Sequence, residues 1–344
     1  EVLSVDPINI KILVKKMRFF SSHTDPLKKL GAALIFNNIY REMREEDSLI
    51  NIFWFEILHI FINSLSLTEN NLFEDGNTTM QINNALSHLE RVLIEKAHIF
   101  RVSNDKRRVP SDVSGDTLKD LAVWLLKQTG NNSMHCRRAS MDLFIAVAPL
   151  TSNKKVNLKA FVNEIFNSDF INSIYENSLQ TNPTLRGISH SEDCSVLLKW
   201  MQGFCCALDG YNFVIKNNLC DINFKNNKTF TAVNYFLKHL QKADMAEALN
   251  LIEHKTWTFT ILDMEQFKKQ KCACLLSILK VFNAVLSDEI LLKKSSVLWN
   301  KEIWELILNT IFYPQQLGLD DRVSQPKYLE MLKILLNNLP RKIS

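Results

Sequence analysis

The chain has 344 residues, of which 46% are apolar and 23% charged, a composition typical of a folded protein rather than of a disordered or fibrous one. Its 41 basic and 37 acidic residues nearly cancel to a formal charge of +4, so it lacks the strong basic excess of a dedicated DNA-binding domain. Only 8 glycines and 8 prolines occur, and so few breakers favour helices over a turn-rich β-sandwich.

Apolar residues recur at helical spacing along most of the chain. Asp25 and Pro26 predict the start of a helix over 26–44, because one suits the N-cap and the other the first helical position. Ser48 is the predicted cap of a helix over 48–67, whose apolar residues cover most of its circumference and so require several neighbours. The other predicted helices are 8–20, 78–102, 116–129, 133–148, 156–178, 192–216, 229–242, 244–254, 263–287, 299–313 and 326–339.

These segments pair into about seven hairpins of about 45 residues each, which is the length of a HEAT-type repeat. No alternation of strands with helices occurs, so a doubly wound α/β fold is not expected. The sequence therefore predicts an all-α, HEAT-like helical-hairpin solenoid that is continuous over 1–344 and contains no kinase domain. Polar stretches predict possible internal breaks at 68–77, 103–115, 180–190 and 217–228.

The longest apolar stretch, Ile50–Leu67, is interrupted by Asn51, Glu56, His59 and Asn63, which predicts a buried helix rather than a membrane span. Seven cysteines occur at irregular spacings, an odd number without a zinc-ligand pattern. We expect them to be reduced and structural, as in a cytosolic or nuclear protein.

The motifs of common enzyme classes are missing from the sequence. A kinase has to hold phosphates and magnesium and supply a base, yet no G-x-G, G-K-[ST] or D-F-G string is present. Neither H-E-x-x-H nor G-x-S-x-G occurs. No catalytic, cofactor-binding or metal-binding residue is therefore assigned.

Three short basic clusters are the candidate contacts to DNA phosphates or to a protein partner. The middle one lies in the charged stretch 103–115, for which the alternative interpretation is a solvated loop between helices. The candidate residues are Lys28, Lys29, Lys106, Arg107, Arg108, Arg137 and Arg138.

Several strings resemble the large helical-repeat region of the phosphatidylinositol-3-kinase-related kinases of DNA end joining. They are KKLGAALIFNNIYREMREEDSL (Lys28–Leu49), LAVWLLKQTG and CRRASMDLF within Gly115–Val147, and LLKWMQGFCCALDGYNFVI (Leu197–Ile215). The resemblance is looser at Lys271–Leu286 and Pro314–Leu339, and little is recognised over 151–190.

The resemblance implies a non-catalytic scaffold segment that acts in double-strand break repair by non-homologous end joining. Its implied partners are the Ku heterodimer, double-stranded DNA ends and other repeats of the same polypeptide. The implied localisation is nuclear, and no membrane is expected among the partners. It would relay activation to a distant serine/threonine kinase domain, and ATP and magnesium would belong to that domain. The alternative is a generic HEAT-type protein adaptor without a kinase.

Overall fold

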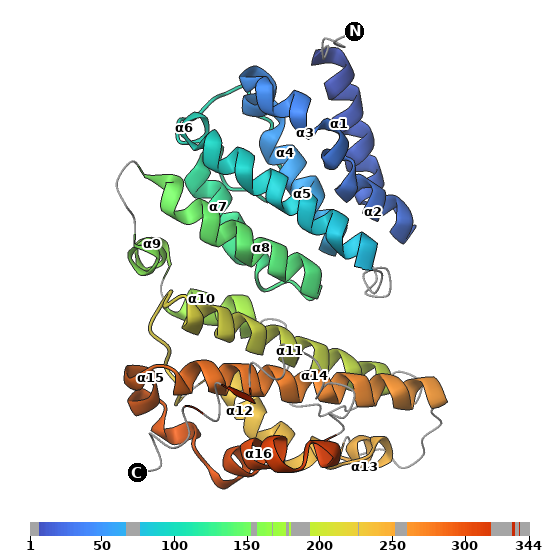
Figure 1. The fold of residues 1–344 in the computed structure, drawn as a ribbon, viewed down its shortest axis with the longest axis vertical. Coiled ribbons are helices and arrows are strands. Elements are labelled where there is room, and N and C mark those ends of the chain that lie inside the picture. The colour runs from blue at the N-terminus through green and yellow to red at the C-terminus, as the bar shows by residue number, and fades with distance from the viewer. Residues whose placement is uncertain are drawn as a thin grey trace. The chain divides into compact units, whose positions relative to one another are not determined.

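The computed structural model describes residues 7–66, 76–152, 157–166, 168–176, 179, 193–225, 227–251, 260–317, 332–333 and 337. Every regular element within these ranges is a helix, and none of the described residues forms a strand (Figure 1). The predicted all-α, helical-repeat class is thereby confirmed. The chain divides into two compact units, Glu1–Phe161 and Val162–Ser344, each with a buried core of its own.

The first unit consists of helices that are joined mostly by short turns. Its central helix, α4, packs against α1, α2 and α8, while α7 and α8 form a hairpin across the turn at 129–133. The elements are α1 Pro7–Ser21, α2 Pro26–Leu34, α3 Phe36–Glu45, α4 Asp47–Ser66, α5 Gly76–Glu95, α6 Ala97–Phe100, α7 Leu118–Gln128, α8 Met134–Val147, a 3-10 turn at Ala148–Thr151, and α9 Leu158–Ile165, which runs across the boundary between the units.

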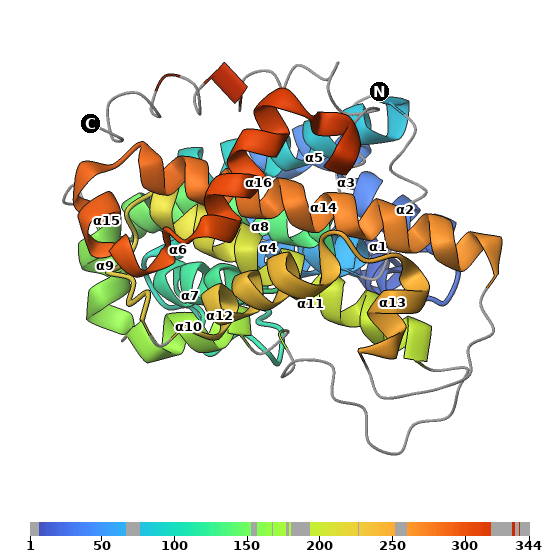
Figure 2. The same cartoon turned by 90° about the horizontal axis from the view of Figure 1, so that it is seen from below.

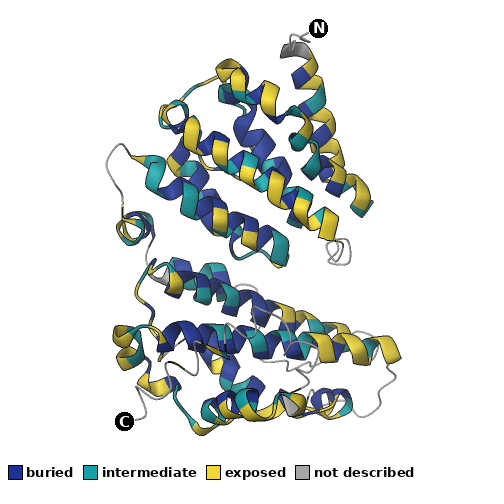
Figure 3. Ribbon diagram, in the orientation of Figure 1, coloured by how far each residue is buried: buried dark blue, intermediate teal, exposed yellow. Residues whose placement is uncertain are grey.

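Helix α4 forms the core of the first unit, and its residues are mostly dark blue in Figure 3. Trp54, Phe55, Leu58 and Ile62 are completely buried. By length and composition α4 could cross a membrane, but 72% of its apolar window is buried inside the protein. The prediction of a buried helix is therefore confirmed, since its apolar side chains already pack against neighbouring helices.

The second unit is built around two long helices, α11 and α14, which pack side by side along their length (Figures 1 and 2). Cys205 of α11 contacts Gln270 and Cys274 of α14, and Asp209 of α11 contacts Ser277. The residue later in α11 contacts the residue later in α14, so the two helices run in the same direction, as equivalent helices of successive repeats do. The elements are α10 Ser168–Glu176, α11 Asp193–Lys216, α12 Lys228–Tyr235, a π-helical turn at Phe236–Leu240, α13 Met245–Asn250, α14 Ile261–Leu286, α15 Glu289–Lys294, a 3-10 turn at Ser296–Leu298, α16 Lys301–Phe312 and a 3-10 turn at Pro314–Leu317.

Polar side chains set several of the helix ends. Asp25 accepts a hydrogen bond from the Leu27 N–H and Pro26 is the first residue of α2, as predicted. Helix α4 begins at Asp47, one residue before the predicted cap Ser48, and the Asp47 carboxylate suits the positive end of the helix dipole. Asn218 follows α11 with φ 47°, the left-handed conformation that ends many helices and that asparagine tolerates.

Several predicted helices are divided in the structure. The predicted helix 26–44 has a turn at Ile35, 78–102 is divided at Lys96, and 156–178 is divided between α9 and α10. Periodicity does not register such breaks, because the apolar face continues across them. The predicted helix 326–339 falls almost wholly outside the described residues.

The predicted internal breaks fall in two groups. The break at 103–115 lies within the loop between α6 and α7, and that at 217–228 lies between α11 and α12. Those at 68–77 and 180–190 lie mostly outside the described residues. The boundary between the units coincides with none of the four. Continuity of one repeat array over 1–344 stays a prediction.

Candidate functional site: the anchored loop and the basic clusters

The loop between α6 and α7, residues 101–117, carries the middle basic cluster and is here named the anchored loop. Its two ends are tied together, because Asp116 accepts hydrogen bonds from Ser103 Oγ (2.9 Å) and from the Asn104 N–H (2.6 Å). Thr117 then caps α7 in a reciprocal arrangement with Asp120. The loop is therefore a closed, ordered element rather than a loose connection.

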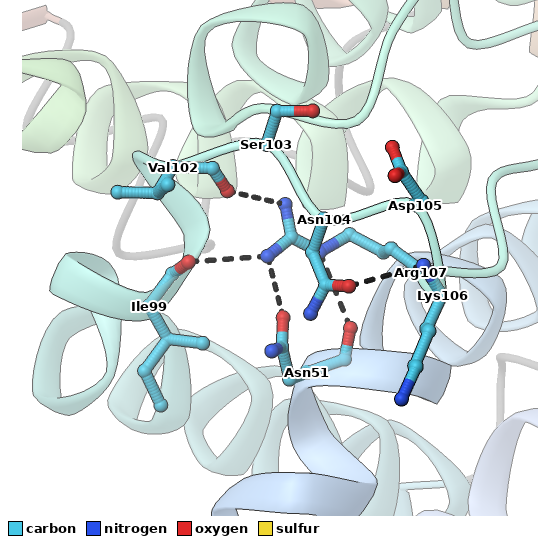
Figure 4. A pocket seen from close by; sticks show the side chains of 8 residues that line it. All are labelled: Asn51, Ile99, Val102, Ser103, Asn104, Asp105, Lys106 and Arg107. Carbon is cyan, nitrogen blue, oxygen red and sulfur yellow. Dashed lines mark hydrogen bonds between the residues drawn. The ribbon is translucent and has the colours of Figure 1, made fainter.

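Arg107 points into the protein from this loop and is only 6% exposed. Its guanidinium donates to the Asn51 carbonyl (3.2 Å), to Asn51 Oδ1 (2.5 Å), and to the carbonyls of Val102 (3.1 Å) and Ile99 (3.1 Å) (Figure 4). It also donates to the Asp116 carbonyl. Four carbonyls and one amide oxygen thus surround the planar cation, an arrangement that suits the five donors of arginine.

The aromatic core supports the same side chain. The guanidinium carbon of Arg107 lies 5.3 Å from the ring centroid of Phe55 and 5.6 Å from that of Phe100. Burial lowers the pKa of Arg107, and the nearby Asp116 raises it. Arginine keeps its charge through such shifts, so the loop holds a permanent cation at the surface of the core.

Arg108 turns the other way and pairs with Glu56 of α4. Its Nε lies 3.0 Å from Glu56 Oε2, and Arg18 of α1 approaches Glu56 Oε1 at 3.7 Å. The Arg108 N–H also donates to the Ile52 carbonyl at 2.8 Å. Glu56 is 5% exposed, so two cations from different elements compensate a carboxylate that the core would otherwise disfavour.

Glu56 makes the stability of the first unit depend on pH. Burial raises its pKa, against the opposing charges of Arg108 and Arg18. A carboxyl whose pKa is raised by folding contributes stability that is complete below the pKa of the unfolded chain and is lost as pH rises through the folded-state pKa. The folded protein is thus less stable with Glu56 ionised than with Glu56 protonated.

Glu56→Gln is therefore expected to lose less free energy of unfolding than the wild type as pH rises from about 4 to about 7. Urea unfolding at a series of pH values measures this difference, with the exposed Glu46→Gln as the matched control. Parallel pH profiles for Glu56→Gln and the wild type would contradict the interpretation.

Asp112 is the third side chain by which the anchored loop reaches α4. Its Oδ1 lies 2.9 Å from His59 Nε2, and its Oδ2 accepts a hydrogen bond from Trp124 Nε1 of α7 at 2.7 Å. Burial lowers the pKa of His59, although Asp112 raises it, so the neutral imidazole is favoured at neutral pH. Residues 51, 52, 56 and 59 of α4 thus hold the loop.

A surface hollow of about 390 Å³ lies beside Arg107, and Figure 4 shows the residues around it. Asn51, Ile99, Val102 and residues 103–107 line it. Arg107 is already bonded to carbonyls, so the exposed Lys106 is the cation that this hollow offers to a ligand. The charged residues of the lining are Asp105, Lys106 and Arg107.

The other two basic clusters also divide into inward and outward members. Arg137 of α8 is 4% exposed and donates to the carbonyls of Asn131 (3.0 Å) and Asn132 (2.9 Å), which secures the α7–α8 turn. Arg138 is exposed. Lys28 is exposed with its Nζ 3.4 Å from His23 Nε2, and Lys29 is half-buried.

Of the seven predicted contacts, the structure leaves Lys28, Lys106 and Arg138 on the surface. Arg107 and Arg137 have structural roles, and their guanidinium groups are turned away from any external phosphate. The interpretation of 103–115 as a solvated loop does not hold for Arg107, because its guanidinium donates inward to the carbonyl of Asn51, 56 positions earlier in the sequence, and to that of Ile99, 8 positions earlier. Whether the exposed three contact a partner stays a prediction.

The residues of α4 that contact the anchored loop were not identified from the sequence. Asn51, Glu56 and His59 interrupt an otherwise apolar helix, and this was the signal that could have found them. Within the described residues no three His, Cys, Asp or Glu side chains gather as metal ligands. Five of the seven cysteines are buried.

Two helical units with separate cores and a loop held by internal hydrogen bonds define a helical-repeat protein segment. A family model described as "DNA-dependent protein kinase catalytic subunit, CC1/2" matches residues 2–341. The chain therefore belongs to the family of DNA-dependent protein kinase catalytic subunits, and the resemblance seen in the sequence is confirmed. The match includes residues 151–190, where little was recognised.

Individual relatives agree with the family match. The DNA-dependent protein kinase catalytic subunit of Xenopus laevis is 28% identical over 359 residues, which cover 97% of this chain and 8% of that protein. That of Gallus gallus is 30% identical over 344 residues, 91% of this chain and 8% of the relative. That of Mus musculus is 34% identical over 224 residues, 61% of this chain and 5% of the relative. The chain thus spans less than a tenth of the relatives it matches.

Proposed function

We propose that this chain is a non-catalytic scaffold segment of a DNA-dependent protein kinase catalytic subunit that acts in double-strand break repair by non-homologous end joining. The family match over residues 2–341 carries the proposal. The packing supports it, because Arg107, Arg108 and Asp112 of the anchored loop are bonded to residues of α4. In this proposal the segment holds partners and relays activation to a distant serine/threonine kinase domain in the nucleus. The generic adaptor without a kinase is less well supported, because every relative named above is a kinase catalytic subunit.

The proposed contacts are the exposed cations Lys28, Lys106 and Arg138, with Lys29 at the edge of the surface. Mobile surface cations gain affinity for DNA phosphates by releasing counterions, and that gain declines with salt. The proposed partners are double-stranded DNA ends and the Ku heterodimer. ATP and magnesium would bind only in the distant kinase domain.

Charge reversal in the full-length protein tests this contact. The triple variant K28E/K106E/R138E is expected to bind DNA ends more weakly. In a plot of log Kd against the logarithm of the salt concentration, its slope should be smaller by about 0.9 for each phosphate contact removed. Lys225→Glu, an exposed lysine of the second unit, is the matched control. An unchanged salt slope in the triple variant would rule out these residues as DNA contacts.

The non-catalytic part of the proposal has its own test. Purified residues 1–344 are expected to show no ATP turnover, since no phosphate-binding motif is present in the sequence. Turnover that a point substitution within the segment abolishes would refute this part. A transcript whose reading frame stopped here, instead of reaching a lipid-kinase-like domain, would favour the adaptor.

A further inference from the structure

Two buried thiols from different helices meet in the core of the second unit. Cys205 of α11 and Cys274 of α14 have their Sγ atoms 3.4 Å apart, although 69 positions separate them in sequence. A disulfide requires an S–S distance of about 2.0 Å, so an inward movement of little more than 1 Å would join them. Neighbouring helices that pack along their length hold the two residues at this separation.

The surroundings of the two sulfurs differ. Cys205 is 8% exposed, and its Sγ accepts a hydrogen bond from Gln270 Nε2 at 3.4 Å. Cys274 is completely buried, and its Sγ lies 3.5 Å from the Met201 carbonyl as donor. One thiol thus has a donor beside its sulfur and belongs to a residue with some remaining exposure, while the other is enclosed within the core.

We propose that Cys205 and Cys274 form a redox modification site, in which hydrogen peroxide converts the pair into a disulfide that links α11 to α14. The sulfur of Cys205 attacks the peroxide oxygen, which breaks the O–O bond and gives a sulfenic acid and one water. The sulfur of Cys274 then displaces the sulfenic hydroxyl, which leaves as a second water once it takes up a proton. The two thiols together lose two electrons and two protons, and hydrogen peroxide is reduced to two waters.

The order of the two steps follows from the environments. The thiolate is the nucleophile, and burial strongly raises the pKa of the Cys274 thiol. Cys205 is the less enclosed of the two and has the Gln270 donor beside its sulfur, which places it for the first attack on peroxide. Cys274 is suited to the second step, because the sulfenic acid forms within reach of its sulfur and needs no diffusing partner.

The test uses the 344-residue chain, folded and treated with hydrogen peroxide. We expect two of the seven thiols to escape alkylation and one cross-linked peptide to join residues 205 and 274. The thermal midpoint should rise by roughly 5–10 °C and return after treatment with dithiothreitol, because the bond closes a long loop in the unfolded chain.

Three serine variants complete the test. Cys205→Ser should abolish both the cross-link and the rise in Tm, whereas Cys136→Ser, at a buried cysteine of the first unit, should leave both unchanged. Cys274→Ser should trap the sulfenic acid at Cys205, which a dimedone adduct at that residue would report. Seven alkylated thiols after peroxide treatment of the folded wild type, or a cross-link between other cysteines, would overturn the proposal.

Discussion

Arg107→Ala is expected to reduce the free energy of unfolding by about 3 kcal/mol, an effect of the size found when buried charge networks are broken. The substitution removes the donor from the carbonyls of Asn51, Val102 and Ile99 and leaves them without this partner. It also removes the planar group that lies against Phe55 and Phe100. Urea unfolding of the purified chain measures the loss.

Two further variants show whether hydrogen bonding is the cause. Arg107→Lys should recover little of the loss, because an ammonium group cannot reach five oxygens spread around a plane. Lys106→Ala, at the exposed neighbouring residue, should change stability by less than about 0.5 kcal/mol. Equal effects at 106 and 107 would mean that the buried guanidinium does not hold the loop in place.

Gly210→Ala is expected to destabilise the second unit by about 2 kcal/mol, although alanine is the better helix former. Gly210 lies inside α11, and a Cβ at this position would overlap the ring of Tyr175 in α10. Tyr175 is completely buried, so its ring cannot withdraw without moving α10. The glycine thus permits the close approach of α10 to α11, and chemical unfolding reports the loss when it is replaced.

A double-mutant cycle separates this contact from other causes. In a Tyr175→Ala background the overlap is gone, and Gly210→Ala should become neutral or stabilising. Gly31→Ala in α2 is the matched control, since nothing lies within 4 Å of its added Cβ, and it should stabilise by about 0.5–1 kcal/mol. The same loss at Gly210 in both backgrounds would show that the ring is not responsible.

Much of the fold follows from local pattern. Asp25 and Pro26 start a helix where the sequence predicts it, and the apolar run after Ser48 becomes the core helix α4. These successes share a cause, because caps and periodicity act within a few residues of one another. The divisions at Ile35 and Lys96 were not predicted, since a helix can change its course there while its apolar face stays buried.

The candidate site was harder to predict, because its contacts are distant in sequence. Arg107 and Arg108 are chemically alike and adjacent, yet one is bonded to Asn51 and the other pairs with Glu56. A charge count treats them as one basic cluster, and only the fold of the loop on α4 distinguishes them. The contact of Gly210 with Tyr175 is equally invisible to periodicity, as it depends on how two helices approach.

The inward turn of Arg107 changes what other macromolecules can recognise in this loop. Trypsin-like proteases bind a basic side chain that is presented on an extended backbone, and an unfolded chain offers three such side chains in a row at 106–108. In the folded chain Arg107 is buried and Arg108 is paired with Glu56, so that Lys106 is the exposed member of the three. Lys106, Arg107 and Arg108 are therefore a run of three accessible cations in the unfolded chain but not in the native one.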